Sequence, residues 1–227
     1  MAAEREQLLQ MGMPESVAER GEIFSPTSVG VIVHTGDFVF EERVRKRSGE
    51  PEVLLVRQAD KLVYGVHPWG IPAGKAEQGE RIIQVAFREV LEETGMVIDY
   101  KRLRWFCSPG DRQAILSYQI TLLDIPLWNE AEDYEMEIKV FPPASSVNTS
   151  EIDRLALVPV ETFADHMVGG PTRPYRKLDL LPDYLYYPKS HEVNEEVDFV
   201  LVRYKEKIWQ EIRHQMFVRK IIPAYLG

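Results

Sequence analysis

The sequence has only one cysteine, Cys107, so neither an intramolecular disulfide nor a zinc site built from several cysteines can form. It also has no apolar run near the ~18 residues that a membrane-spanning helix needs, so we expect no membrane span. The opening residues, MAAEREQLLQ, carry charges where a signal peptide has an apolar core. We therefore expect no export signal and a cytoplasmic protein.

The chain lacks an excess of basic residues: 27 Lys and Arg stand against 36 Asp and Glu, a formal net charge of −9. An acidic protein repels a polyphosphate backbone, so we expect no nucleic-acid partner. A small phosphorylated substrate is compatible with this charge if a divalent cation screens the two negative partners. Internal repeats are absent, and 227 residues suffice for one domain with extensions.

The apolar pattern of the first part of the chain predicts helices followed by strands. One or two short helices are expected over 2–20. Apolar runs at 31–33 and 38–40 flank a hairpin-type turn at 34–37. The remaining expectations for this part are a solvated loop at 41–51 and a strand at 52–57.

The strongest helical signal lies at 80–94, and Gly95 is placed to end this helix in a left-handed cap. Its apolar residues recur at spacings of three and four and are Ile83, Ala86, Phe87 and Val90. Further predicted elements are strands at 97–106, 114–123, 137–141 and 155–160, a short helix at 161–167 and an amphipathic helix at 195–219. Such a mixture of strands and helices indicates an α+β or α/β fold.

Three carboxylates share one face of the helix predicted at 80–94. Glu89, Glu92 and Glu93 stand at i, i+3 and i+4, a spacing at which like charges destabilise a helix by a few tenths of a kcal/mol per pair. A bound cation would remove this repulsion. Because the ligands are hard oxygens, without Cys or His nearby, the pattern favours Mg²⁺ or Mn²⁺ over zinc.

The residues around these carboxylates form a longer pattern, from Gly74 through Glu80 to Arg88 and on to Met96. Written as Gly-x5-Glu-x7-Arg-Glu-U-x-Glu-Glu-x-Gly-U, with U apolar, it resembles the signature of the Nudix hydrolases at every position. The resemblance extends over about 27–170. We therefore divide the chain into an N-terminal helical segment (1–26), a Nudix hydrolase domain (27–170) and a C-terminal extension with an amphipathic helix (171–227).

The resemblance implies an α/β/α sandwich with a mixed sheet, and Mg²⁺-dependent hydrolysis of the pyrophosphate bond in a nucleoside diphosphate derivative. Carried over by position, Glu89, Glu92 and Glu93 would be catalytic and bind the metal, together with the backbone carbonyl of Ala73. Gly74 and Arg88 would support them, with Arg88 orienting the carboxylates. Glu80 is left as either an ion-pair partner or a metal ligand.

The family often uses one more carboxylate, from a late loop, as base or ligand. Glu151 precedes the predicted strand at 155–160 and is our candidate for this catalytic role. Glu135 and Glu137, in an acidic and loop-like stretch, compete with it. Each of the three is also compatible with a plain solvated surface glutamate.

Ser108, Pro109 and Gly110 resemble a turn of ADP-ribose-cleaving members, which makes ADP-ribose or a nucleotide sugar the leading substrate. The spacing from Met96 is short for that subgroup, and a plain β-turn explains the residues equally well. Three candidates for substrate binding are Arg57, Trp69 and Arg112, of which Trp69 is equally compatible with the core and Arg112 with a surface position.

Two other functions remain open. One is a nucleoside triphosphate or dinucleoside polyphosphate hydrolase of the same family, and the other is a catalytically silent ligand sensor. The intact carboxylates Glu89, Glu92 and Glu93 argue against a sensor, because nothing in a silent domain requires their mutual repulsion. The apolar stripe of the extension fits either a lid over the pocket or a homodimer interface.

Overall fold

The computed structural model describes most of the chain between residues 2 and 159 and two short strands beyond it. The described residues are 2–35, 39–41, 44–46, 52–60, 67, 69–120, 132–133, 139–141, 143–159, 184–187 and 199–202. Within these ranges, no helix combines the length and the apolar character that a membrane crossing requires.

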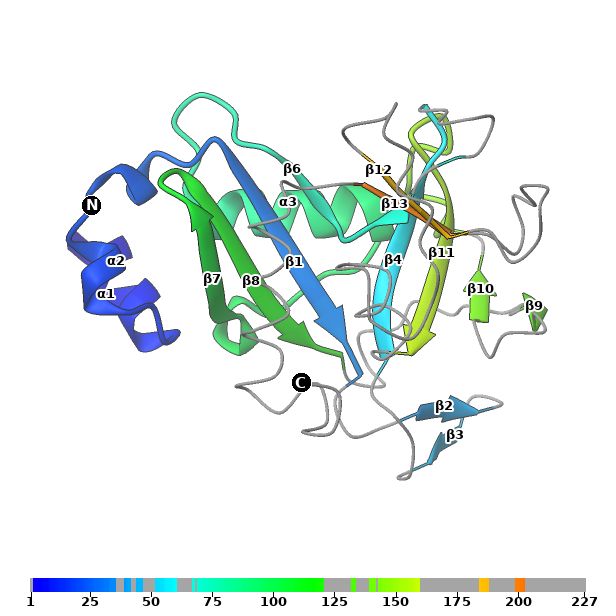
Figure 1. The fold of residues 1–227 in the computed structure, drawn as a ribbon. Helices are drawn as coiled ribbons and strands as arrows, with labels where there is room; N and C mark the ends of the chain where they lie inside the picture. Colours follow the sequence, from blue (N-terminus) through cyan, green and yellow to red (C-terminus); the bar gives the residue numbers. More distant parts are fainter. Residues whose placement is uncertain are drawn as a thin grey trace.

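The amino-terminal segment is helical, as predicted for 2–20. Its elements are α1 (Ala2–Gln10), α2 (Glu15–Ala18) and the 3-10 turn η1 (Glu22–Phe24). They lie beside strand β7 (Arg104–Gly110) at one edge of the sheet (Figure 1), where the backbone N–H of Trp105 donates to the carbonyl of Met11 at 2.8 Å. Leu8 and Ile23 are fully buried in the main core, so this segment is part of the core.

Helix α1 also reaches the start of the longest helix, α3 (Ile82–Thr94). Glu4 is 4% exposed, its Oε2 lies 3.8 Å from Nε of Arg81, and its Oε1 is buried without a hydrogen-bond partner among the described residues. Arg81 is the N-cap residue of α3, and a guanidinium has no acceptor with which to cap a helix. The start of the helix is closed by Gln84, whose Oε1 accepts from the N–H of Arg81 at 3.0 Å.

A mixed sheet runs through the domain, with β1 (Ser28–His34) at its centre. Strand β8 (Gln113–Gln119) is parallel to β1, and β7 is antiparallel to β8. On the other side of β1, β6 (Ala73–Lys75) pairs with its first residues and β4 (Glu52–Gln58) meets its end. One edge of β1 is thus paired along its whole length by β8, and the other is paired by β6 at its start and by β4 at His34.

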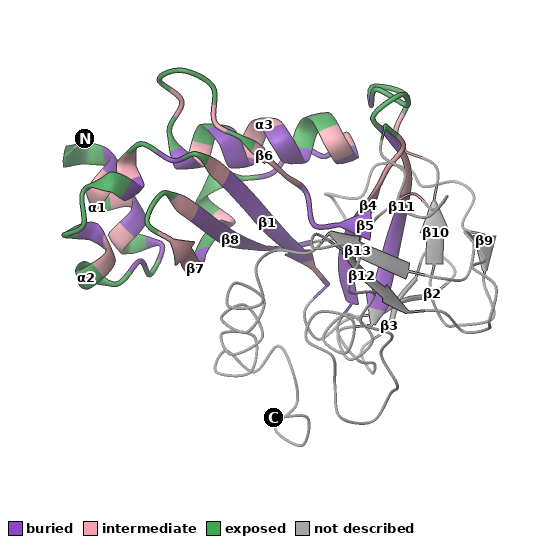
Figure 2. Cartoon of the chain, turned by 45° about the horizontal axis from the view of Figure 1, so that its top comes forward, coloured by how far each residue is buried: buried purple, intermediate pink, exposed green. Residues whose placement is uncertain are grey.

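Strand β4 connects β1 to the second part of the sheet. Strand β11 (Ile152–Pro159) runs antiparallel along β4, and β5 (Trp69–Gly70) pairs on the opposite side of β4. The buried strands β1, β4 and β11 mark the core in Figure 2. The remaining strands are β2 (Val39–Glu41), β3 (Val44–Lys46), β9 (Glu132–Asp133), β10 (Lys139–Phe141), β12 (Tyr184–Tyr187) and β13 (Phe199–Val202).

Helix α3 confirms the periodic helix predicted at 80–94, although it starts at Ile82. Val85, Ala86 and Val90 are fully buried against the sheet, and the opposite face of the helix is exposed (Figure 2). The helix ends at Gly95, whose φ of 74° is left-handed and whose N–H donates to the carbonyl of Leu91 at 2.9 Å. The local pattern was therefore sufficient to place this helix.

The predicted α/β class with a mixed sheet is confirmed: β1 and β8 are parallel, their neighbours are antiparallel, and α3 packs on β1 and β6. The short helix predicted at 161–167 and most of the extension at 171–227 lie outside the described residues.

The hairpin predicted around 34–37 was wrong. Strand β2 pairs with β3, which falls inside the predicted loop at 41–51, and the described pairs of β1 are with β4, β6 and β8. At His34, where the hairpin would begin, one edge of β1 pairs with Gln119 of β8 and the other with Val53 of β4, so both edges are already paired at this position.

Two further element predictions need correction. The strand predicted at 97–106 begins only at Arg104, because the Asp99 side chain accepts from the N–H of Lys101 at 2.9 Å and starts the 3-10 turn η2 (Tyr100–Arg102). Within the helix predicted at 195–219, residues Phe199–Val202 form strand β13 instead. This run of aromatic and aliphatic residues pairs with β12 and meets β5, and such pairing overrides a helical pattern.

Candidate active site

Gly74 and Glu89 are joined by a close fit between strand β6 and helix α3. A Cβ atom built on Gly74 would overlap the carboxylate of Glu89, so any larger residue here would require that carboxylate to move. Glu89 is 7% exposed, and it reaches this space because α3 packs on β6. The glycine and the carboxylate that the sequence pattern singled out are thus parts of one packing arrangement.

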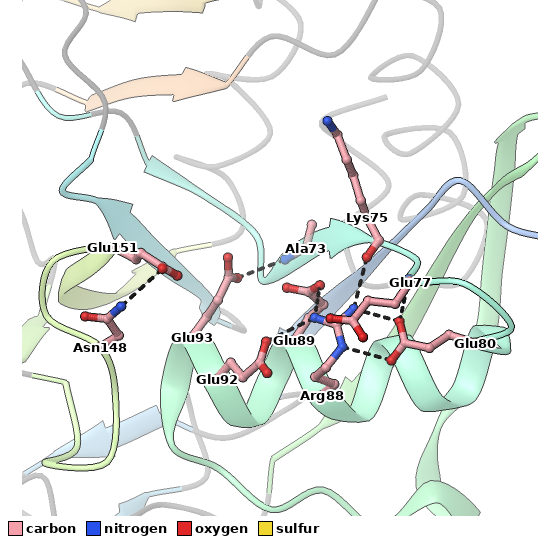
Figure 3. A network of polar contacts seen from close by, with 10 residues as sticks. All are labelled: Ala73, Lys75, Glu77, Glu80, Arg88, Glu89, Glu92, Glu93, Asn148 and Glu151. Atoms are coloured by element: carbon pink, nitrogen blue, oxygen red, sulfur yellow. Dashed lines mark hydrogen bonds and ion pairs between the residues drawn. The ribbon is translucent and has the colours of Figure 1, made fainter.

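Arg88 lies between four oxygen-bearing groups (Figure 3). Its Nε and Nη2 donate to the two carboxylate oxygens of Glu80 at 2.9 and 2.8 Å. Its Nη1 donates to Glu89 at 2.6 Å and to Glu92 at 3.0 Å, and Nη2 also reaches the carbonyl of Lys75 at 3.0 Å. One guanidinium therefore holds the spacing of three carboxylates.

The charges of this network act on Glu80 and Glu89 in opposite directions. Hydrogen bonds from Arg88 lower the pKa of Glu80 to about 2, so this carboxylate is fully ionised near neutral pH. Burial raises the pKa of Glu89, Arg88 offsets part of that effect, and the charges of Glu92 and Glu80 add to it. Glu89 is thus a buried carboxylate with more negative than positive charge around it.

Glu93 points toward the backbone of Ala73, the residue before Gly74 (Figure 3). The N–H of Ala73 donates to Oε2 of Glu93 at 2.9 Å. The sequence resemblance assigned the carbonyl of Ala73 to the metal, and the structure brings this residue into the carboxylate cluster through its N–H. The structure therefore brings together Ala73, Gly74, Glu80, Arg88, Glu89, Glu92 and Glu93, all of which the sequence singled out.

Glu151 lies in the loop before β11, and this loop packs on the carboxyl end of α3. A Cβ on Gly95 would come within 2.5 Å of Cβ of Ala144, which shows how closely this loop approaches. Figure 3 shows Glu151 on the same side of α3 as Glu93, with Asn148 beside it. The competing candidates Glu135 and Glu137 lie outside the described residues.

The donor set fits a hard divalent cation. Glu89, Glu92 and Glu93 offer only carboxylate oxygens, and a cation beside Glu89 would remove the unfavourable burial of its negative charge. No group of three or more His, Cys, Asp or Glu in the described ranges is arranged to hold a metal as it stands. In the carboxylate cluster, Glu89 accepts a hydrogen bond from Arg88 and Glu93 accepts one from the N–H of Ala73.

Arg57 and Trp69 are neighbours across β4 and β5, but Arg57 is committed to a partner that the sequence did not reveal. Its Nε and Nη2 donate to both carboxylate oxygens of Asp153 at 2.9 and 2.7 Å, and its guanidinium lies 6.0 Å from the Trp69 ring. Burial acts to raise the pKa of Asp153, but the hydrogen bonds and charge of Arg57 outweigh it and the pKa falls.

The surroundings of Trp69 and Arg112 favour structural roles. Trp69 is 3% exposed and belongs to the core, one of the two alternatives left open by the sequence. Nε of Arg112 donates to the carbonyl of Ser25 at 2.6 Å, and the Arg112 carbonyl accepts from the N–H of Thr27 at 2.7 Å. Arg112 thus fastens the amino-terminal segment to the turn before β8, and its contact with substrate stays a prediction.

Sequence reasoning missed Asn148 and Asp153. Asn148 had a local signal, because an Asn two residues before Ser150 is typical of a turn in which the Asn side chain bonds the backbone. Asp153 had no such signal, since its partner Arg57 is 96 residues away in the chain.

Comparisons with known proteins point to one family. A family model described as "NUDIX domain" matches residues 38–178, more than half of the chain. Nudix hydrolase 6 of Arabidopsis thaliana is 29% identical over 140 residues, which are 62% of this chain and 43% of that protein. The protein named nucleoside diphosphate-linked moiety X motif 6 of Xenopus laevis is 44% identical over 52 residues, 23% of each chain. The matches span less than half of the length of these relatives.

A comparison with solved structures lists a NUDIX hydrolase from Nitrosomonas europaea. It is 21% identical to this chain and superimposes with a TM-score of 0.35. The match covers 61% of this chain and 75% of that one.

Proposed function

The chain belongs to the Nudix family, and from this premise we propose that it is a divalent-metal-dependent hydrolase of a pyrophosphate bond in a nucleoside diphosphate derivative. The observation that carries the proposal is the cluster of Glu89, Glu92 and Glu93 on α3, in which Glu89 and Glu92 share a single guanidinium and Glu93 binds the N–H of Ala73. Such a surplus of carboxylates is costly without a cation and useful with one, because phosphate oxygens need positive charge near them.

Glu89, Glu92 and Glu93, with the carbonyl of Ala73, would hold the metal, and Mg²⁺ or Mn²⁺ suits their oxygen donors. When bound, the ion supplies positive charge that offsets the negative charge of the phosphates in the transition state. Nη1 of Arg88 donates to both Glu89 and Glu92 and so fixes the orientation of their carboxylates. Glu80, which accepts from Nε, holds the guanidinium in place.

Glu151 is the base of the proposed reaction. Its carboxylate takes a proton from water while the water oxygen forms a bond to one phosphorus. The bond from that phosphorus to the bridging oxygen breaks, and its electron pair leaves with the departing phosphate. Water is split between the two products, so no further reactant is required.

ADP-ribose or a nucleotide sugar is the leading substrate. What supports it is the resemblance of Ser108, Pro109 and Gly110 to the turn of ADP-ribose-cleaving members. In the structure the Ser108 hydroxyl lies 2.7 and 2.9 Å from the carbonyl oxygens of Gly110 and Gln113, and its single proton is donated to one of them or shared between both. The Ser108 hydroxyl therefore stabilises its own turn. Pro109 lies in β7, at one edge of the sheet.

Product analysis tests the proposal. Purified protein is incubated with ADP-ribose and Mg²⁺ at mildly alkaline pH, together with Glu93→Gln and with Glu19→Gln as a control for loss of an exposed charge. We expect AMP and ribose 5-phosphate from the wild type and from Glu19→Gln, and a loss of about 100-fold or more with Glu93→Gln. Chelation of the metal should abolish turnover in all three.

Other outcomes would change the assignment. Cleavage of nucleoside triphosphates or dinucleoside polyphosphates, without cleavage of ADP-ribose, would keep the metal site and replace the substrate. Binding of ADP-ribose without turnover of any of these compounds would favour a ligand sensor.

A further inference from the structure

The loop before β11 holds Glu151 by its backbone as well as by its side chain. The N–H groups of Glu151 and Ile152 both donate to the carbonyl of Asn148 at 3.0 Å. The carbonyl of Glu151 accepts from the N–H of Ala59, at the end of β4, at 2.7 Å. The backbone of Glu151 is thus tied to its own loop on one side and to the central sheet on the other.

The side chain of Asn148 has only one orientation that satisfies its neighbours. The N–H and the hydroxyl of Ser150 both donate to Oδ1 of Asn148, at 3.2 and 2.7 Å. A backbone N–H can only donate, so the atom that faces it must be the amide oxygen. The amide nitrogen therefore faces the other way, where Nδ2 donates to Oε1 of Glu151 at 3.1 Å.

This arrangement leaves the second carboxylate oxygen of Glu151 for a reactant. Oε1 of Glu151 is engaged by Asn148, and no described contact engages Oε2. The loop packs against Gly95, two positions after Glu93, and Figure 3 shows Glu151 and Glu93 on the same side of α3. A water molecule near the α3 carboxylates would thus meet Oε2 of a carboxylate whose orientation is fixed through Oε1.

We propose that Asn148 is a positioning residue, whose amide, fixed by Ser150, holds the Glu151 carboxylate in the orientation that accepts the proton of the attacking water. The inference rests on the proposed function, since it needs Glu151 to be the base. It differs from a purely structural role, because the turn needs only Oδ1 of Asn148 and the base needs only Nδ2.

Asn148→Asp separates the two roles. The substitution keeps an oxygen to accept from Ser150, so the turn is retained, and it replaces the donor to Glu151 by a negatively charged acceptor that repels it. We expect kcat to fall about tenfold or more, KM to stay within about twofold, and the melting temperature to change little. Glu19→Gln, a change of charge at an exposed residue outside this loop, is the control and should retain wild-type kcat.

A second readout is independent of turnover. The side-chain amide resonances of Asn148 are followed by NMR in the metal-free protein. They should shift when Glu151 is changed to Ala and stay near their wild-type positions when the exposed Glu19 is changed to Gln.

The outcomes separate the inference from the proposed function. The inference is overturned if Asn148→Asp retains kcat within twofold, or if the amide resonances do not respond to Glu151→Ala. It is also overturned, with the hydrolase intact, if Glu93→Gln abolishes turnover and Glu151→Gln does not reduce it. Failure of the wild type to cleave any nucleotide would contradict the proposed function and, with it, the role of Glu151 as base. This holds even if NMR shows the contact between the Asn148 amide and Glu151.

Discussion

The carboxylate of Glu89 lies in the space that a Cβ atom on Gly74 would occupy. These residues come from β6 and α3, and their contact sets how deeply the carboxylate cluster sits against the sheet. Because Glu89 is also held by Arg88, a displacement at Gly74 is passed on to Glu92 and Glu80.

Gly74→Ala should therefore weaken metal binding. The added methyl group forces the Glu89 carboxylate away from β6, and we expect affinity for Mn²⁺ and turnover to fall by about tenfold or more. Titration with Mn²⁺ by electron paramagnetic resonance measures the affinity. Gly110→Ala is a suitable control, because its Cβ would meet only the side chain of Gln113 at 3.2 Å or more. Equal affinity in both variants would contradict the packing argument.

Glu80→Gln should lower stability in a pH-dependent manner. The hydrogen bonds from Arg88 hold the pKa of Glu80 at about 2, below the ordinary value of 4.5. A carboxylate with a lowered pKa contributes stability that is complete above 4.5 and is lost as the pH falls toward 2. We expect the wild type to melt at a higher temperature than the variant at pH 7, with the difference shrinking between pH 5 and pH 3. A difference that stays constant over this range would argue against the ion pair as its cause.

The contribution of Glu4 to stability should change with pH in the opposite direction to that of Glu80. Burial raises the pKa of Glu4 above 4.5, and Arg81 and the N–H of Ile82 offset only part of this effect. The stability that such a group contributes is present below its unfolded pKa and is lost as the pH rises through the folded pKa. Glu4→Gln removes the buried charge, so it should match the wild type near pH 4 and melt at a higher temperature at pH 7.5, as measured by thermal unfolding followed by circular dichroism.

Arg57→Gln and Asp153→Asn form a matched pair, because each breaks the same bidentate ion pair. The pair is partly buried, and we expect both variants to lose about 1–3 kcal/mol of stability in chemical denaturation. Since both oxygens of Asp153 are taken up by Arg57, we also expect the KM for ADP-ribose to change alike in both. A rise of KM in Arg57→Gln alone would show that the guanidinium contacts substrate.

Local residue spacing alone predicts the helix that carries the site. Helix α3, its left-handed end at Gly95 and the shared face of Glu89, Glu92 and Glu93 follow from residue spacing within one element, because the helical repeat acts over three or four residues. Strand β13, by contrast, has an apolar pattern that also fits a helix, and its pairing with distant strands decided the outcome.

Tertiary structure decided which side chains these carboxylates meet. The contact of Glu89 with Gly74, the N–H of Ala73 on Glu93 and the carboxylate of Glu4 at the start of α3 join separate elements. Asp153 and Arg57 meet across 96 residues because β11 pairs with β4, a register that no local pattern encodes. Local spacing thus identified the chemistry, and the packing of α3 and β11 on the sheet set the partners that orient it.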